Sequence, residues 1–180
     1  MNKTQNKKQI WLTAMADYVL EHGLSASSLR PLAKAAGTSD RMLIYHFKSK
    51  DNLINEILKN LFGRLADELS QILPAKKAST RLQCVRDILA ALKAVHYKRY
   101  MRVWLELISY STHQQNAYAA IGHQLVDDIL IWISDYVPDS EPDPQRIAKA
   151  ILVLLEGENV LHSVGREDVA IDGIEFLLES

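Results

Sequence analysis

The scarcity of helix breakers constrains this chain more than any other feature of its sequence. Its 180 residues include 7 Gly and 5 Pro, and three of the prolines fall together between residues 138 and 144. Between the breakers, apolar residues recur every three or four positions, which is the period of an amphipathic helix. No segment alternates as a half-buried strand does. We therefore expect an all-α protein of about nine helices, with an N-terminal three-helix domain and a C-terminal helical bundle.

The first expected helix ends at a glycine. Ile10, Ala14 and Tyr18 fall at i, i+4 and i+8, which predicts a helix over about residues 7–22. Its apolar face also includes the flanking residues Trp11, Met15 and Val19. Gly23 follows at the position of a C-terminal cap, where a left-handed backbone conformation is common. The sequence therefore places the first chain reversal at Gly23.

Two short helices follow this reversal. Ser28 precedes one as its N-cap, and Gly37 ends it after about two turns. Ser39 is the expected N-cap of the next, which directs Leu43 and Phe47 inward. The tight turn between them sets the third helix across the second, which is the layout of a helix-turn-helix. In that layout the third helix enters the major groove of DNA.

The exposed residues of the third helix suit contact with bases. Arg41 can donate to O6 and N7 of a guanine, Asp40 can accept from N4 of a cytosine, and Met42 can contact a thymine methyl. A structural interpretation stays open for Asp40, because an acid at a helix start also interacts favourably with the helix dipole. Arg41 could equally be a solvated surface charge.

Further candidates are expected to contact phosphates. Lys50 begins the next helix, where its ammonium and the free N–H groups meet a phosphate. His46 is alternatively a partly buried structural histidine. The full set of candidate DNA-binding residues is Ser28, Arg30, Ser39, Asp40, Arg41, Met42, Tyr45, His46 and Lys50.

The distribution of charge agrees with a polyanionic partner for the first third of the chain. Residues 1–60 contain 9 Lys and Arg against 5 Asp and Glu, whereas residues 61–180 contain 12 against 17. The near-neutral total of −1 conceals this asymmetry. A basic segment on an acidic body indicates binding to nucleic acid, although a net charge of this size is also common on solvated surfaces.

The remainder of the chain also has the spacing of helices. Leu53, Ile57 and Leu61 begin a long apolar stripe that Pro74 ends, and Asp143 with Pro144 has the pattern of a helix start. Further helices are expected around residues 82–92, 98–110, 116–136, 147–155 and 169–177.

Several classes of protein are excluded by missing features. Cys84 is the single cysteine, so no internal disulfide is possible, and no 18-residue uncharged apolar stretch occurs. His96, His113, His123 and His162 lack the spacing of metal ligands. No catalytic motif is recognisable. We expect a cytoplasmic protein that is not an enzyme and has no metal or cofactor.

Two runs of residues resemble one family. Leu29–Ser39 reads LRPLAKAAGTS, and Leu43–Leu53 reads LIYHFKSKDNL. Together they resemble the tetracycline-repressor (TetR) family over about residues 8–60. Ile44 departs from the pattern, because the family usually has there a tyrosine that contacts a phosphate. Pro31 also departs, since it replaces a residue that is usually polar or charged.

The resemblance implies a prokaryotic, all-helical homodimer with two domains per subunit. Residues 1–52 would bind DNA, and residues 53–180 would bind an effector and dimerise through the last two helices, including Leu154 and Leu177. An effector would change the spacing of the two recognition helices and so release a palindromic operator. The expected function is therefore a ligand-responsive regulator, and specifically a repressor.

Large side chains and a few polar groups in the second half are candidates for a largely apolar effector pocket. Glu106 is a further polar candidate, and each of these residues is alternatively part of the core, the surface or an interface. The candidates are Tyr100, Trp104, Tyr110, His113, Trp132, Glu156 and Asn159.

Two other functions stay open from sequence. The C-terminal half could dock a protein partner in place of a small ligand on a DNA-binding protein. Alternatively, the chain could be a helical enzyme or carrier with an incidental N-terminal resemblance. A pocket of a few hundred Å³ would favour the effector over the protein partner.

Overall fold

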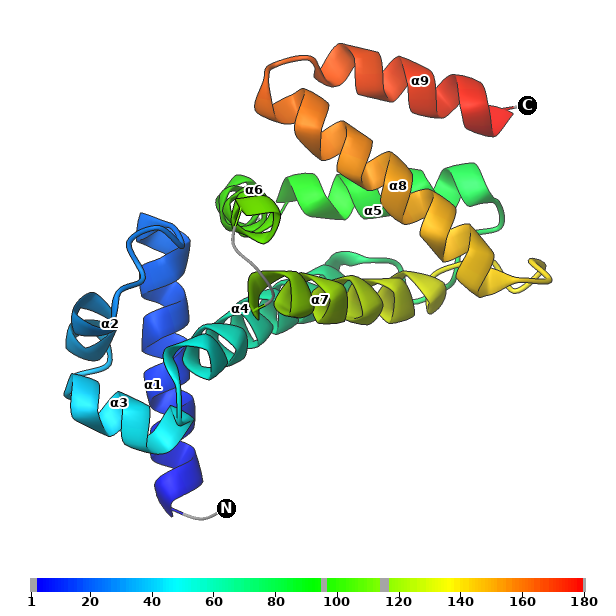
Figure 1. Cartoon of the computed structure of the whole chain (residues 1–180). Coiled ribbons are helices and arrows are strands. Elements are labelled where there is room, and N and C mark those ends of the chain that lie inside the picture. Colours follow the sequence, from blue (N-terminus) through cyan, green and yellow to red (C-terminus); the bar gives the residue numbers. More distant parts are fainter. Residues whose placement is uncertain (1–2, 95–96, 114–116, 180) are drawn as a thin grey trace. The chain divides into compact units, whose positions relative to one another are not determined.

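The computed structural model describes residues 3–94, 97–113 and 117–179, with side chains for all of these except 3–5, 113, 171, 175 and 177–179. Within these ranges the chain forms nine α-helices and no strand (Figure 1). The all-α prediction is thereby confirmed. The helices are α1 (Lys3–His22), α2 (Leu29–Ala35), α3 (Asp40–Phe47), α4 (Lys50–Ile72), α5 (Arg81–Ala94), α6 (Lys98–His113), α7 (Ala117–Ser134), α8 (Pro144–Ser163) and α9 (Glu167–Glu179).

The chain divides into two compact units. One consists of Met1–Asp67 with His96–Leu125, and the other consists of Glu68–Val95 with Val126–Ser180. Helices α4 and α7 therefore each contribute to both units. The functional boundary between residues 52 and 53 stays a prediction, because compactness alone does not test it.

Most helix ends follow the predicted capping residues. Ser39 accepts a hydrogen bond from the backbone N–H of Met42 at 3.3 Å, and Asp143 accepts one from that of Arg146 at 3.0 Å. Ser28 occupies the N-cap position of α2, but its side chain makes no capping hydrogen bond. Capping therefore supports the start of α3 more directly than that of α2.

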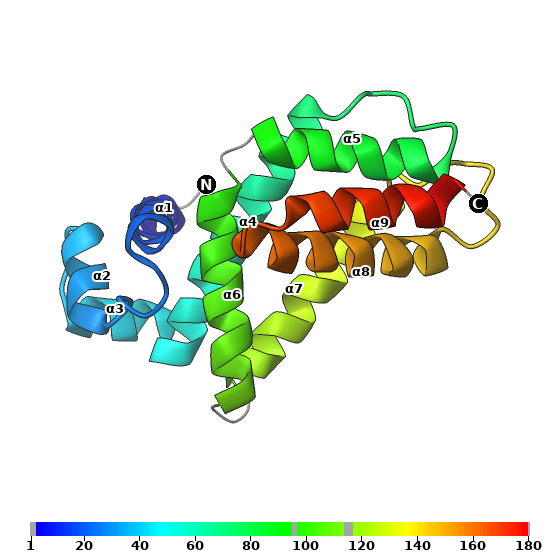
Figure 2. The ribbon, with the colours of Figure 1, turned by 90° about the horizontal axis from the view of Figure 1, so that it is seen from above.

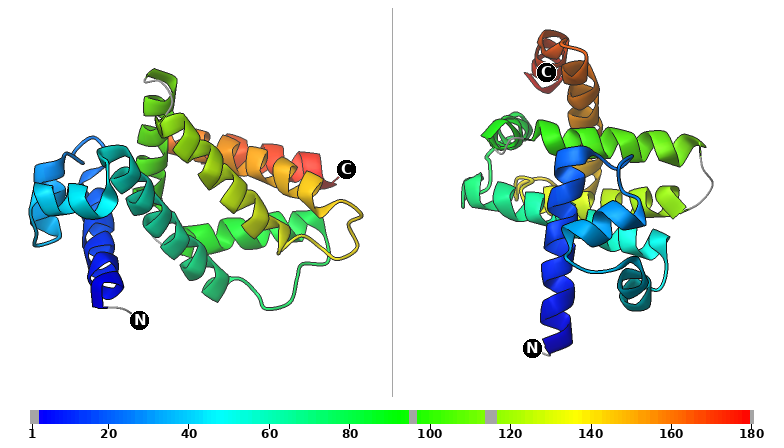
Figure 3. Two further views of the ribbon diagram at one scale, coloured as in Figure 1. Left: turned by 60° about the horizontal axis from the view of Figure 1, so that its bottom comes forward. Right: turned by 90° about the vertical axis from the view of Figure 1, so that its left-hand side faces the viewer.

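The core of the first unit contains only part of the predicted apolar face of α1. The flanking residues Trp11, Met15 and Val19 are buried, whereas Ile10 is 61% exposed. The buried stripe is therefore the flanking one, one residue further along than the stripe that begins at Ile10. Its larger side chains bury more apolar surface than Ile10 and Ala14 would, and that burial stabilises the unit. Helix α1 packs against α2 and α6, and α2 packs against α3 (Figure 3).

The second unit is built around α5, α8 and α9. Helix α8 packs against α9, and α5 contacts both of them (Figure 2). Cys84, Val85 and Ile88 of α5 are buried, as are Ile151 and Leu155 of α8. None of the helices in the described part of the chain has the length and hydropathy of a membrane span.

Candidate nucleic-acid interface

Helix α3 has one buried face and one exposed face. Leu43 and Phe47 are fully buried in the first unit, as their spacing of four residues predicts. Between them, Tyr45 is 68% exposed, and Met42 beside Leu43 is 38% exposed. An eight-residue helix is marginal by itself, so these two anchors and the Ser39 cap hold it in place. Its outer face is therefore accessible to a binding partner.

The candidate DNA-binding residues lie on accessible positions of this region. Asp40 and His46 are half-buried. Ser28, Arg30, Ser39, Arg41, Met42, Tyr45 and Lys50 are exposed.

His46 has packing contacts that favour a structural role. Its ring lies edge-on to Trp11 of α1 with centroids 5.2 Å apart, and Tyr45 approaches it in the same way at 5.2 Å. The contact with Trp11 ties the outer turn of α3 to α1. His46 therefore helps to position the outer face of α3.

The exposed charge of this region is almost entirely positive. Over residues 28–50, Asp40 is the one acid, and it is half-buried. A surface of this kind attracts a phosphate backbone in a salt-dependent way. The basic residues over the same range, all exposed, are Arg30, Lys34, Arg41, Lys48 and Lys50.

Lys48 is a candidate that our sequence reasoning missed. It ends α3 with φ 71°, a left-handed conformation that is uncommon for a residue other than glycine. Its ammonium lies 3.3 Å from the Tyr45 carbonyl oxygen and 5.6 Å from the centre of the Tyr45 ring. A lysine at a helix C-terminus next to an exposed aromatic was the available sequence signal.

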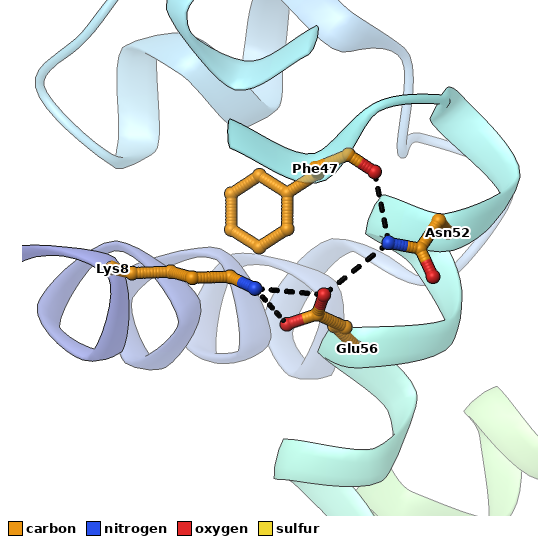
Figure 4. A network of polar contacts seen from close by, with 4 residues as sticks. All are labelled: Lys8, Phe47, Asn52 and Glu56. Carbon is orange, nitrogen blue, oxygen red and sulfur yellow. Dashed lines mark hydrogen bonds and ion pairs between the residues drawn. The ribbon is translucent and has the colours of Figure 1, made fainter. Parts of the chain in front are cut away.

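A polar network holds the end of α3 against α1 and α4 (Figure 4). The Lys8 ammonium lies 2.8 and 2.7 Å from the two carboxylate oxygens of Glu56, and 4.7 Å from the centre of the Phe47 ring. Asn52 donates from Nδ2 to the Phe47 carbonyl at 2.8 Å and to Glu56 Oε1 at 3.3 Å. These four residues fix the position at which α3 ends and α4 begins.

Helix α6 holds the end of α1. The Arg102 guanidinium donates from Nη2 to the carbonyls of Leu20 and Glu21 at 2.8 and 2.7 Å, and Glu106 accepts from the backbone N–H of Ser25 at 2.7 Å. At Gly23, with φ +88°, an added Cβ would lie 2.5 Å from Glu106 Oε1. The structure therefore places Glu106 on the turn between α1 and α2, whereas the sequence had suggested an effector contact.

The candidate effector residues of the first unit are aromatic and packed. Tyr100 and Trp104 are buried, and the Trp104 ring lies 6.0 Å from that of Phe62. Tyr110 stacks on Tyr118 with ring centres 5.2 Å apart. The side chain of His113 lies outside the described residues.

The candidates of the second unit include buried polar groups. Trp132 donates from its indole N–H to Ser70 Oγ at 3.0 Å, and Glu156 is half-buried. Asn159 is buried, and its Oδ1 has no hydrogen-bond partner. Glu158, which our sequence reasoning missed, is buried beside Asn159. A helix with 3.6 residues per turn directs both 158 and 159 toward the same side as Ile151 and Leu155, so the spacing itself contained this signal.

Two cavities among the described residues have none of the candidate effector residues in their lining. The first, of about 260 Å³, lies between the starts of α4 and α7 in the first unit. The second, of about 10 Å³, adjoins Cys84 and Tyr136 in the second unit and is smaller than a single water requires. Among the described residues, no group of three or more His, Cys, Asp or Glu side chains could hold a metal ion.

The second unit also exposes apolar side chains in helical register. Val153 and Val160 of α8 are 71% and 51% exposed, and Val164, the residue that caps its C-terminus, is 69% exposed. Together with Gly157, they fall at i, i+4, i+7 and i+11, on the side of α8 opposite to its buried face. The nearby α9 exposes Val169 and Phe176 in addition. Leu154, which the sequence suggested for an interface, is half-buried, and the side chain of Leu177 lies outside the described residues.

Comparison with known proteins places these observations in context. Residues 14–57 match the family model described as bacterial regulatory proteins, tetR family. The chain is 28% identical over 88 residues, 48% of its length, to the HTH-type transcriptional repressor KstR2 of Mycolicibacterium smegmatis, and the aligned part spans 42% of that repressor.

Solved structures show the same fold over nearly the whole chain. The transcriptional regulator SCO7518 from Streptomyces coelicolor A3(2) superimposes with a TM-score of 0.72 at 20% identity, covering 97% of this chain and 99% of its own. The multidrug binding protein EbrR, solved in complex with imidazole, superimposes with a TM-score of 0.69 at 16% identity, covering 96% and 90%. At sequence identities of 20% and 16%, the structural similarity establishes the fold alone.

Proposed function

We propose that this chain, which belongs to the TetR family of bacterial transcription regulators, is a repressor that binds a palindromic operator as a homodimer and is released by a small-molecule effector. The members of this family are transcription regulators, not enzymes. As a DNA-binding protein, it is expected to act in the cytoplasm of a prokaryotic cell.

The observation that supports DNA binding most strongly is the two-faced α3. Leu43 and Phe47 anchor the helix, and Arg41, Met42 and Tyr45 stand on its outer side. Arg41 lies in the first turn, where recognition helices contact base edges. A bidentate contact from its guanidinium to guanine contributes about 1–3 kcal/mol of discrimination against the wrong base.

Phosphate contacts are assigned to the remaining basic residues. Lys50 is at the start of α4, where ammonium and helix dipole act together on an anion. Lys48 and Tyr45 extend the same surface at the end of α3, and Arg30 extends it on α2. Tyr45 takes the place of the phosphate-contacting tyrosine that the family has at the position of Ile44.

Dimerisation is assigned to the exposed apolar stripe of α8. Val153, Gly157, Val160 and Val164 lie in one row, and Gly157 leaves open space above its backbone. Two such rows from two copies can pack closely, because burying apolar area is the main favourable term in association. Val169 and Phe176 of α9 extend the surface. A dimer of this kind presents two copies of α3 to half-sites about 34–36 Å apart.

Effector response is supported by one buried polar atom that lacks a protein partner. Asn159 has an unpaired buried Oδ1, which costs stability unless a ligand or water donates to it. Two similar proteins agree with the proposal of a ligand-responsive repressor, since KstR2 is a repressor and EbrR is a multidrug-binding protein. The remaining effector-contact candidates are Tyr100, Trp104, Tyr110, His113, Trp132 and Glu156.

A protein partner in place of a small effector is the second candidate function. It is favoured by the exposed valines of α8, which a different protein could cover as well as a second copy. Sedimentation of the purified chain distinguishes a second copy from a different protein as the occupant of this surface, because a homodimer formed through the α8 valines would already cover them.

The proposed function is tested by selecting binding sites from a random duplex library with the purified protein. We expect a short palindrome whose affinity falls steeply with salt, because each neutralised phosphate releases counterions. Weak binding without an enriched sequence, and without salt dependence, would contradict the proposal. The selected duplex then serves to find the effector by its release of DNA.

A further inference from the structure

The cavity between α4 and α7 has a lining unlike that of an apolar effector pocket. Its volume of about 260 Å³ is just below the range of roughly 300–1,000 Å³ for small-molecule sites. All of its lining residues belong to the first compact unit. They are Asp51, Asn52 and Asn55 of α4, and Ala117, Ala120, Ile121 and Gln124 of α7.

The charge of this lining is negative. Asp51 is the one ionisable residue among the seven, and none is Lys, Arg or His. The field of its carboxylate reaches α7, because the pKa of Tyr118 is raised first by burial, then by Tyr110 and then by Asp51. A concave surface with a single sign of charge raises the local concentration of the opposite ion. Asp51, the one charge of the lining, therefore favours a cation over an anion, whereas the adjacent positive charge of Lys50 lies outside the lining.

The free hydrogen-bonding atoms of the lining are mainly acceptors. Asn52 donates its two amide hydrogens to the Phe47 carbonyl and to Glu56, so only its Oδ1 remains available (Figure 4). The Asp51 carboxylate accepts only. Asp51 and Asn52 are both exposed, so a ligand that brings N–H donors can reach their oxygens. Asn55 Oδ1 also has no partner, but it is buried and does not face the cavity.

The opposite wall is mostly apolar. Ala117, Ala120 and Ile121 of α7 present methyl and methylene groups across from the acceptors of α4, and the amide of Gln124 is the one polar side chain on that wall. A ligand that satisfies both walls has N–H donors and positive charge at one end and a compact hydrocarbon body at the other. We propose that this cavity binds a small organic cation with several N–H donors, an amidinium or a primary ammonium that carries a compact apolar group.

The site is connected to the recognition helix by a single side chain. Asn52 lines the cavity and donates to the carbonyl of Phe47, the last residue of α3. Asp51 follows Lys50, which is assigned to a DNA phosphate. A bound cation that pulls Asn52 or neutralises Asp51 therefore alters the end of α3 and the phosphate contact together. This regulatory role rests on the proposed function, whereas the cation site itself does not.

The site is tested by titration calorimetry of the full chain with benzamidine, without DNA. Benzamide and benzoate are matched probes of nearly the same shape that are neutral and anionic. We expect benzamidine to bind, benzamide to bind more weakly and benzoate to give no heat. Asp51→Asn should weaken benzamidine roughly 10- to 100-fold, since a hydrogen bond to a charged group is lost. Asp67→Asn, an exposed acid of α4 outside the lining, should bind as the wild type does.

Equal binding of benzamidine and benzoate by the wild type would overturn the proposal, as would an unchanged affinity in Asp51→Asn. The probe comparison needs no variant, so it stands even if Asp51→Asn folds poorly. The regulatory role is tested by adding benzamidine to the selected duplex complex, where we expect weaker DNA binding. Unchanged DNA affinity despite calorimetric binding would refute that role alone. Failure to bind any duplex would refute the proposed function and leave the calorimetric result intact.

Discussion

The helix-turn-helix region and the α8–α9 pair differ in what they expose. Helix α3 buries Leu43 and Phe47 and exposes a charged outer face. Its large apolar anchors are therefore already covered within the unit, and its exposed face suits a polar partner. Helix α8 buries Glu158 and Asn159 while Val153 and Val160 are exposed. Buried polar groups cost stability unless they are paired, and apolar side chains exposed in one row mark an interaction surface. The difference agrees with the proposal that the outer face of α3 contacts DNA and that the exposed face of α8 contacts a second copy of the chain.

The largest effect is expected from removing an anchor of α3. Phe47→Ala should lower the free energy of unfolding by roughly 3–5 kcal/mol, because it leaves a cavity beneath the helix. Denaturant unfolding measures this change. Tyr45→Ala, on the exposed side of the same helix, should alter unfolding by no more than about 0.5 kcal/mol while it weakens DNA binding. Equal destabilisation by the two variants would remove the distinction between the inner and outer faces of α3.

A charge in the α8 stripe should separate the subunits. Val153→Asp places a carboxylate where the proposed interface is apolar, so the dissociation constant of the dimer should rise about 100-fold or more. Sedimentation velocity over a range of concentrations measures it. Val153→Ile keeps the surface apolar and should stay dimeric. A dimer that persists in Val153→Asp would mean that another surface pairs the subunits.

A smaller and opposite effect is expected at Asn159. Asn159→Leu replaces an amide that has an unpaired oxygen with an apolar group of similar size, so stability should stay level or rise by about 1 kcal/mol. Ile151→Ala on the same buried face should instead cost about 2–5 kcal/mol. If Asn159→Leu is destabilised as strongly as Ile151→Ala, its oxygen has a structural partner and is no effector contact.

The smallest effect is expected at the surface of the second unit. The bidentate hydrogen bonds from Arg81, at 2.7 Å each, lower the pKa of Glu141 below its ordinary value of 4.5. A carboxyl whose folded pKa is depressed contributes stability above its unfolded pKa and loses it as the pH falls through the folded value. The stability difference between wild type and Glu141→Gln should therefore be greatest near neutral pH and vanish in acid. A difference that is constant with pH would exclude this ion pair as its source.

The sequence predicted the first region in more detail than the second. The Gly37–Ser39 turn, the Ser39 cap and the buried pair Leu43 and Phe47 are local features, and local propensity and periodicity determine them. Ile10 of α1 is exposed against the prediction, since three apolar residues in a row, Ile10–Leu12, leave the buried stripe ambiguous until a partner helix selects it.

The missed residues owe their roles to contacts distant in sequence. Glu106 accepts from Ser25 across 81 positions, and Lys8 pairs with Glu56 across 48. No periodicity within one helix contains such information. Glu158 was overlooked for a different reason, because a carboxylate is rarely buried and Glu156 was preferred on the spacing of three to Asn159. The sequence therefore predicts which helices form, and the fold decides which polar groups meet.

The most direct test of the central claim compares Arg41→Ala with Lys50→Ala on the selected duplex and on a scrambled one. If α3 contacts bases and the start of α4 contacts phosphate, Arg41→Ala loses about 1–3 kcal/mol on the selected duplex and little on the scrambled one. Lys50→Ala then weakens both alike and reduces the salt slope by about one. Equal weakening of both duplexes by Arg41→Ala, with an unchanged salt slope for Lys50→Ala, would contradict this assignment.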